Sequence, residues 1–273
     1  MKYQTKYIDL EQEFPECEIT SFLGDIHGDF SVISDKVIKY AKNSVIFLCG
    51  DVGVGFCKPG YYERELSKVQ RVLDSNNSVI VLIRGNHDDP RYFHDTKSVS
   101  ESLATGFRRI IFADDYDIFR TKENHVVLCM GGATSYDRSN RRYGDDIFYG
   151  EEFYLPETDI YEWILNQYPE CQSEDMPDHP PINIIASHIA PTYAGNTNKT
   201  IGGLKDEDFK FDPMIQEKCW DERKKMDYLI HLLSYSEKIE YHFHGHYHKH
   251  YFYEDYPTKI VGLDINELYE IRI

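Results

Sequence analysis

The chain has 273 residues, 41% of them hydrophobic, so it can bury a sizeable core, and we expect one domain over residues 1–273. Its 30 Lys and Arg residues against 47 Asp and Glu residues give a net charge of −17, which disfavours binding of a long nucleic acid. No basic segment with a following apolar stretch opens the chain, and no apolar run reaches the roughly 18 residues of a membrane span, so no membrane association is expected.

Apolar runs rich in β-branched residues predict buried strands at 18–23, 44–48, 78–83, 126–130 and 182–186. Helix-like stretches lie near 31–42, 61–75, about 156–167 and 220–234. Pro156 suits the first turn of the third of these helices. The alternation of strands and helices indicates an α/β domain with largely buried sheets.

Beyond residue 238 the pattern changes to short strands, at 238–244, 250–254, 259–263 and 268–273. This change predicts a second, more antiparallel sheet. The six cysteines lack CxxC spacing, and Cys49 and Cys129 lie inside apolar runs. We therefore expect buried free thiols and a protein of the reducing cytoplasm.

Five histidines fall in the nine residues 242–250, each two positions from the next. Residues two apart on an extended chain point to the same side, so an unbroken strand would crowd all five rings on one face. Gly245 interrupts this regularity. We expect a strand that ends near His244 and a loop that carries His246 and His248.

Polar side chains follow five of the predicted strands at the point where each strand ends. They are Asp25, His27, Asp51, Asn86, His87, Asp88, His188, His246 and His248. Because ligand sites of open α/β sheets lie beyond the carboxyl ends of the strands, these five loops can converge. Carboxylate, imidazole and amide oxygen without thiolate suit Mn, Fe or Zn. An aspartate shared by two such ions would create a centre able to clamp a phosphoryl group.

In this order, the motifs D-x-H, G-D, G-N-H-D, an isolated His and G-H-x-H resemble those of the calcineurin-like metallophosphoesterases, over residues 25–248. The resemblance implies a four-layer α/β/β/α sandwich with two mixed β-sheets. It also implies a hydrolase that uses two divalent metal ions, with Mn as the expected metal and Fe or Zn as alternatives, to cleave a phosphomonoester or phosphodiester.

The family roles carry over to the matching positions of this chain. One metal ion would be held by Asp25, His27 and His248, the other by Asn86, His188 and His246, with Asp51 bridging them. A hydroxide bridging the two ions would attack phosphorus in line, with His87 as general acid. Asp88 would orient the imidazole of His87. His242, His244 and His250 are outside the motif, and we expect them to be solvated or to support the ligands.

Positive charge for the phosphate is expected from arginines. The stretch from Gly131 resembles a G-G-A-x-S-x-D segment of small bacterial and phage phosphoesterases, and Arg138 follows it. We expect Arg138 to bind substrate, with a surface salt bridge as the alternative. Arg84 could face either the site or the core. The long loop 191–213 is expected to be a lid or binding loop, or else a surface excursion.

Two differences from the motifs of known branches of this family narrow the range of expected substrates. The Ser/Thr protein phosphatase branch carries G-D-x-V-D-R-G, whereas residues 50–56 read GDVGVGF and lack the second Asp and the Arg. The lariat-debranching branch has a Cys where Asp25 stands here. We therefore expect a small phosphate ester, a nucleotide or phosphomonoester, rather than a phosphoprotein. The alternatives are an inactive metal-binding interaction module of the same fold and a Ser/Thr protein phosphatase, and the complete ligand set favours the enzyme.

Overall fold

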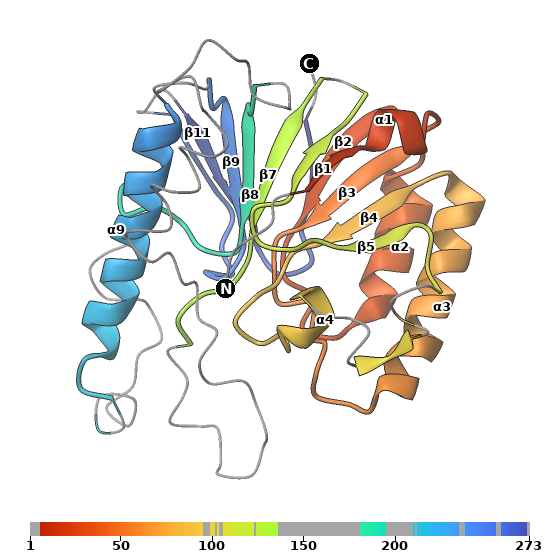
Figure 1. Ribbon diagram of the computed structural model, residues 1–273, viewed down its shortest axis with the longest axis horizontal. Helices are drawn as coiled ribbons and strands as arrows, with labels where there is room; N and C mark the ends of the chain where they lie inside the picture. Colours follow the sequence, from red (N-terminus) through yellow and green to blue (C-terminus); the bar gives the residue numbers. More distant parts are fainter. Residues whose placement is uncertain are drawn as a thin grey trace.

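The computed structural model describes residues 6–94, 99–101, 103, 106–122, 124–135, 181–194, 210, 212–234, 238–254 and 258–271. The predicted helix at about 156–167, Arg138 and most of the loop 191–213 lie outside these residues. Two β-sheets pack face to face, and helices cover their outer faces (Figure 1). Within the described part of the chain, no helix is long and apolar enough to cross a membrane.

The smaller sheet has five strands in the order β12-β2-β3-β4-β5. They are β2 (Ile19–Leu23), β3 (Ser44–Leu48), β4 (Val79–Leu82), β5 (Ile110–Phe112) and β12 (Leu268–Glu270). Strands β2 to β5 run parallel, and β12 runs antiparallel to β2. The loops that follow β2, β3 and β4 therefore leave the sheet at one edge.

The larger sheet has seven strands in the order β1-β6-β7-β8-β9-β11-β10. They are β1 (Tyr7–Asp9), β6 (Ile118–Arg120), β7 (Val126–Met130), β8 (Ile184–Ser187), β9 (Tyr241–His244), β10 (Tyr251–Tyr253) and β11 (Lys259–Gly262). Strands β7, β8, β9 and β11 are parallel to one another, whereas β6 and β10 each pair antiparallel to a neighbour.

The expected antiparallel sheet after residue 238 is therefore wrong. Strands β9 and β11 extend the parallel part of the larger sheet, and β12 joins the other sheet beside β2. Most residues of β9 and β11 are buried, as is usual for parallel strands covered on both faces. Short apolar runs mark where strands form, but they carry no information about which neighbour each strand will pair with.

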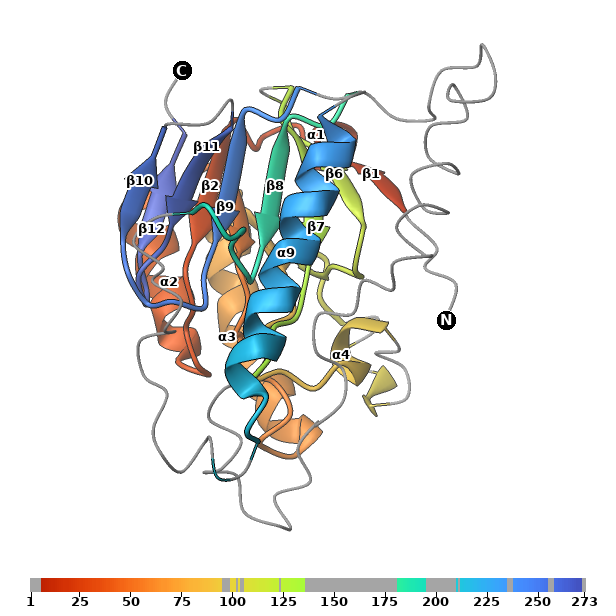
Figure 2. The same cartoon turned by 90° about the vertical axis from the view of Figure 1, so that its left-hand side faces the viewer.

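Helices α2 (Phe30–Tyr40) and α3 (Pro59–Asn76) cover the five-stranded sheet, and α9 (Ile215–Leu233) covers the seven-stranded sheet (Figures 1 and 2). Two shorter helices are α1 (Leu10–Glu13) and α4 (Arg91–His94). Separate hydrophobic clusters lie under α2 and α3, between the sheets, and under α9. The predicted four-layer α/β/β/α sandwich with two mixed sheets is confirmed. The assignment of residues 1–273 to one domain stays a prediction.

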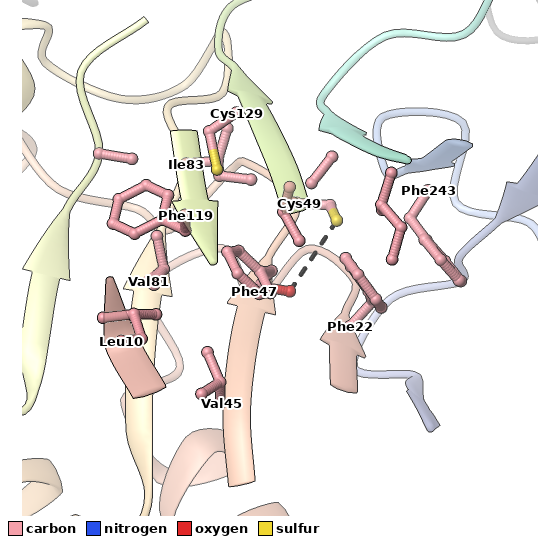
Figure 3. Close-up of a cluster of buried hydrophobic side chains, with 14 of the residues drawn as sticks. Leu10, Phe22, Val45, Phe47, Cys49, Val81, Ile83, Phe119, Cys129 and Phe243 are labelled. Carbon is pink, nitrogen blue, oxygen red and sulfur yellow. Dashed lines mark hydrogen bonds between the residues drawn. The ribbon is translucent and has the colours of Figure 1, made fainter. Parts of the chain in front are cut away.

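The cluster between the sheets joins the two halves of the fold. The rings of Phe22 on β2 and Phe243 on β9 stack with centroids 3.8 Å apart and an interplanar angle of 5° (Figure 3). The thiols of Cys49 and Cys129 are also buried in this cluster, as expected. Cys57 is exposed instead, because it lies on the loop after β3 and not in an apolar run.

Candidate metal centre

Four of the predicted ligands converge from loops of both sheets. Each of Asp25, His27, Asp51 and His248 offers one ligand atom, and these atoms lie within 4.8 Å of one another. His248 Nε2 is 3.0 Å from Asp25 Oδ2 and 3.0 Å from His27 Nε2. His27 Nδ1 is 3.8 Å from Asp51 Oδ2. Carboxylate and imidazole atoms at this spacing could hold a divalent metal ion.

The remaining three predicted ligands form a second group, in which His188 approaches Asp51 Oδ1. His188 Nε2 is 2.9 Å from Asn86 Oδ1 and 3.3 Å from Asp51 Oδ1. The rings of His188 and His246 pack edge to face, with centroids 4.8 Å apart. Oδ2 of Asp51 thus approaches the first group of ligands, and Oδ1 approaches the second. This is the arrangement that a bridging carboxylate requires.

The charges of the buried carboxylates also fit a cation. Asp25 and Asp51 are both almost fully buried, and such groups need nearby positive charge. Burial alone would raise the pKa of Asp51, but His188, His87 and His27 lower it below its ordinary value. Burial would lower the pKa of His188, whereas Asp51 and Asp25 raise it to about 9. The imidazoles, or a bound metal ion, supply the charge that the carboxylates need.

Glycines allow the loops to come this close. A Cβ atom on Gly245 would lie 2.0 Å from Asp25 Oδ1, and one on Gly85 would lie 2.1 Å from Asp51 Oδ1. Neither position has room for a side chain. The glycine next to each of these motifs is therefore required for packing around the carboxylates.

Four of the seven predicted ligands have an unusual backbone conformation. The φ angles of His27, Asp51, His246 and His248 are 46°, 44°, 69° and 48°. Residues other than glycine rarely adopt this left-handed region, and when they do the surrounding structure must hold them there. Such positions cluster at functional sites, which agrees with the predicted ligand roles of these residues.

His87 lies at the rim of this centre. Its backbone N–H donates to Asp51 Oδ1 over 2.9 Å, and its Nε2 atom is 4.0 Å from Asp51 Oδ2. The side chain is 25% exposed, whereas Asp51 is buried. The imidazole therefore borders both the metal centre and solvent, where a bound substrate could reach it.

Asp88 holds two loops of the centre together. Its carboxylate accepts four backbone hydrogen bonds of 2.7–3.0 Å, from Val52, Gly53, Val54 and Gly85. Burial, together with the charge of Asp51, raises the pKa of Asp88 to about 6. Sequence reasoning missed this role, since nothing local indicates it. The predicted orientation of the His87 imidazole by Asp88 stays a prediction.

Arg84 is directed into the interior. Its Nη2 atom is 3.0 Å from Asp115 Oδ2, and a Cβ atom on Gly132 would lie 2.7 Å from the same nitrogen. Asp115 Oδ1 also accepts the Gly131 N–H over 2.9 Å. Arg84 thus packs against the segment after β7. The predicted contacts of Arg84 and Arg138 with substrate stay predictions.

The histidines outside the motif do not share one environment. His242 and His244 are fully buried, so of the two expected alternatives a solvated ring is wrong for both, and support of the metal ligands stays a prediction. Ser187 Oγ lies 2.6 Å from His242 Nε2, and the Tyr251 hydroxyl lies 2.5 Å from His244 Nε2. Burial lowers the pKa of His244 to about 3. His250 has a half-exposed side chain 2.7 Å from Glu267.

Ser135, which sequence reasoning also missed, fixes the Asn86 amide. The Asn86 Nδ2 group donates to the Ser135 hydroxyl over 3.0 Å, which leaves Oδ1 facing His188. Ser135 is buried at the end of the segment that follows β7. The G-G-A-x-S-x-D resemblance singled out this segment for Arg138, but not for its serine.

Removal of this hydroxyl tests whether it positions a metal ligand. We expect Ser135→Ala to weaken binding of a divalent ion by about tenfold, because the Asn86 amide can then rotate and turn its NH₂ group inward. Titration calorimetry of the metal-free protein with Mn²⁺ measures this without any substrate. Ser135→Thr keeps the hydroxyl and should restore the affinity. Equal affinities for Ser135→Ala and the wild type would remove Ser135 from this role.

The substitution Asp88→Asn tests whether the Asp88 carboxylate holds the loop after β3 and the loop after β4 together. An amide has one acceptor oxygen, and its NH₂ group would face backbone donors, so we expect the free energy of unfolding to fall by about 2 kcal/mol or more. Urea denaturation measures the change. Asp35→Asn, at an exposed position paired with Lys39, is the matched control and should change stability by less than about 0.5 kcal/mol. Wild-type stability of Asp88→Asn would contradict the proposed tie.

Comparisons with known proteins bear on the family and the fold. The sequence model of the calcineurin-like phosphoesterases matches residues 21–250. Among solved structures, TT1561 of Thermus thermophilus aligns with a TM-score of 0.50 and 14% identity, over 93% of this chain and 98% of that one. The phosphopantetheinyl hydrolase of Mycobacterium tuberculosis aligns with a TM-score of 0.47 and 10% identity, over 92% of this chain and 91% of that one.

No curated protein matches the sequence significantly. The family match nevertheless spans most of the chain and includes every predicted metal ligand, from Asp25 to His248. The two mixed sheets agree with it. The protein belongs to the calcineurin-like phosphoesterase family.

Proposed function

We propose that the protein is a metal-dependent phosphoesterase that hydrolyses a small phosphomonoester or phosphodiester. The observation that carries this proposal is the position of Asp51, whose two carboxylate oxygens approach two separate groups of ligands. One metal ion would be held by Asp25, His27 and His248, and a second by Asn86, His188 and His246. Manganese is the proposed metal, with iron or zinc as alternatives.

Two divalent ions bound there would polarise the phosphate and supply a nucleophile near neutral pH. The side chains of the protein would assist the departure of the leaving group. The half-buried imidazole of His87 would donate a proton to the leaving oxygen, since it borders the centre and is open to solvent. Its backbone N–H donates to Asp51 Oδ1, which ties the backbone that carries His87 to the candidate bridging carboxylate.

Charge and motif both support a small substrate. The net charge of −17 disfavours a long nucleic acid. Residues 50–56 lack the second Asp and the Arg of the Ser/Thr protein phosphatase motif, which disfavours a phosphoprotein. Arg138 is the proposed cationic contact for the phosphate. We also propose a cytoplasmic location, which the buried thiols of Cys17, Cys49 and Cys129 support because they form no disulfide.

Hydrolysis of a substrate panel tests the proposed function. The metal-stripped protein is assayed with p-nitrophenyl phosphate, bis-p-nitrophenyl phosphate and a phosphopeptide, with Mn²⁺, Fe²⁺, Zn²⁺ or a chelator added. We expect turnover of at least one of the two small esters, only with metal, and little or none of the phosphopeptide. Full activity in the presence of chelator would refute a metal-dependent reaction. Two bound metal ions without any turnover would favour an inactive binding module.

The role of His87 is tested by substitution. We expect His87→Ala to lower kcat by roughly 100-fold or more while two metal ions remain bound, because general acid assistance contributes about that much. The control is His250→Ala, which removes a half-exposed histidine paired with Glu267 and should leave kcat unchanged. If His87→Ala turns over as fast as the wild type, the acid must be another group.

A further inference from the structure

Phe56 is a half-exposed aromatic residue at the rim of the metal centre. Its side chain is 51% exposed, and its ring centroid lies 6.5 Å from that of His87 with an interplanar angle of 35°. A large apolar ring left in water forgoes the free energy that burial would contribute. A single exposed apolar residue is common on protein surfaces, so its neighbours decide whether this one has a role.

The loop that carries Phe56 is anchored by other residues. Val52 and Val54 of the same loop are fully buried, so the loop does not need the Phe56 ring as an anchor. Gly55 has a φ angle of 118°, a conformation that side chains rarely adopt. This glycine changes the direction of the chain after Val54, and the ring of Phe56 faces solvent instead of the core.

Hydrogen bonds fix the backbone on both sides of the ring. The N–H groups of Gly55 and Cys57 both donate to the buried Tyr62 hydroxyl, over 2.9 Å and 2.8 Å. Upstream, the N–H groups of Gly53 and Val54 donate to the Asp88 carboxylate. The ring is therefore presented by a held backbone, and a ligand that covers it would lose little free energy to ordering of the loop.

We propose that Phe56 is a stacking platform for the leaving group of the substrate, and that this leaving group carries a planar aromatic ring, such as the base of a nucleoside phosphate. The inference rests on the proposed function, because His87 would donate its proton to the leaving oxygen. A leaving group attached to that oxygen extends away from the buried metal ligands toward the rim. Among the residues that the structure describes, Phe56 is an exposed aromatic side chain that borders His87 there.

Stacking on an aromatic side chain depends on the flat face of the base and not on its hydrogen-bonding edge. Phe56 therefore selects for a planar ring without choosing between bases. The platform would distinguish a nucleoside phosphate from an ester with an aliphatic leaving group. It would contribute little to binding of the phosphate itself, which lies on the metal side of His87.

A binding experiment tests the platform without requiring turnover. Calorimetry with added Mn²⁺ compares inorganic phosphate with the phosphonate analogue of adenosine 5′-monophosphate, in which a CH₂ group replaces the ester oxygen so that the nucleotide cannot be hydrolysed. We expect the wild type to bind the nucleotide roughly tenfold more tightly than phosphate, which is a usual effect of one stacked base. Phe56→Leu keeps the apolar volume but loses the ring, and should abolish this preference while phosphate affinity stays the same. Phe56→Tyr keeps the ring and should retain the preference.

The control is Tyr40→Leu, which removes a 63% exposed ring at the last residue of α2, the helix that begins just after the His27 loop. It should leave both affinities unchanged. Matching urea unfolding midpoints for all variants would exclude a change in folding. The proposal is overturned if the wild type shows no preference for the nucleotide, or if Phe56→Leu keeps the whole preference.

A kinetic comparison separates this proposal from the proposed function. Phe56→Leu should raise KM about tenfold for adenosine 5′-monophosphate and leave KM for glycerol phosphate unchanged. An equal rise for both esters would also reject the platform. If neither ester is hydrolysed with any metal while Phe56→Leu still loses the binding preference, then the proposed hydrolysis fails and the platform stands.

Discussion

Burial of two carboxylates beneath converging loops is the constraint on which the rest of this structure depends. Asp25 follows β2 and Asp51 follows β3, and both lose nearly all contact with water. Such groups are stable inside a protein only when positive charge and hydrogen-bond donors surround them. The loops after β8 and β9 deliver His188, His246 and His248 from the opposite sheet. The two sheets must therefore meet in one relative position, which the stacked rings of Phe22 and Phe243 help to fix.

Burial of the two carboxylates also explains why the loops around them are held by many hydrogen bonds. Left-handed conformations at four candidate ligands are unfavourable for an isolated chain, so the surroundings must enforce them. Asp88 ties the loop after β3 to the loop after β4 through four backbone hydrogen bonds. Ser135 fixes the Asn86 amide from a third loop. These hydrogen bonds help to hold the candidate ligands in their left-handed backbone conformations.

The loop after β3 combines these features within a few residues. It contains Asp51, the candidate bridge between two metal ions, and the segment held by Asp88. Further along the same loop lies Phe56, whose ring is exposed beside His87. The motif of the Ser/Thr protein phosphatase branch has an Asp and an Arg in the corresponding stretch. Here Val54 and Gly55 stand at those positions, so this loop carries no charged side chain between Asp51 and Phe56.

The sequence by itself determined most of the strands, though not the short β1, β5 and β6, and it determined the order of the motifs and thereby the family. Strands β3 and β7 have the predicted bounds, because an apolar β-branched run is a local property, and each polar motif follows its strand directly. Tertiary structure alone decided the pairing of β9, β11 and β12, the burial of His242 and His244, and the backbone partners of Asp88. These features depend on residues far apart in the chain. Local pattern fixes whether a segment is extended, whereas burial and hydrogen-bond partners are set by whatever else packs against it.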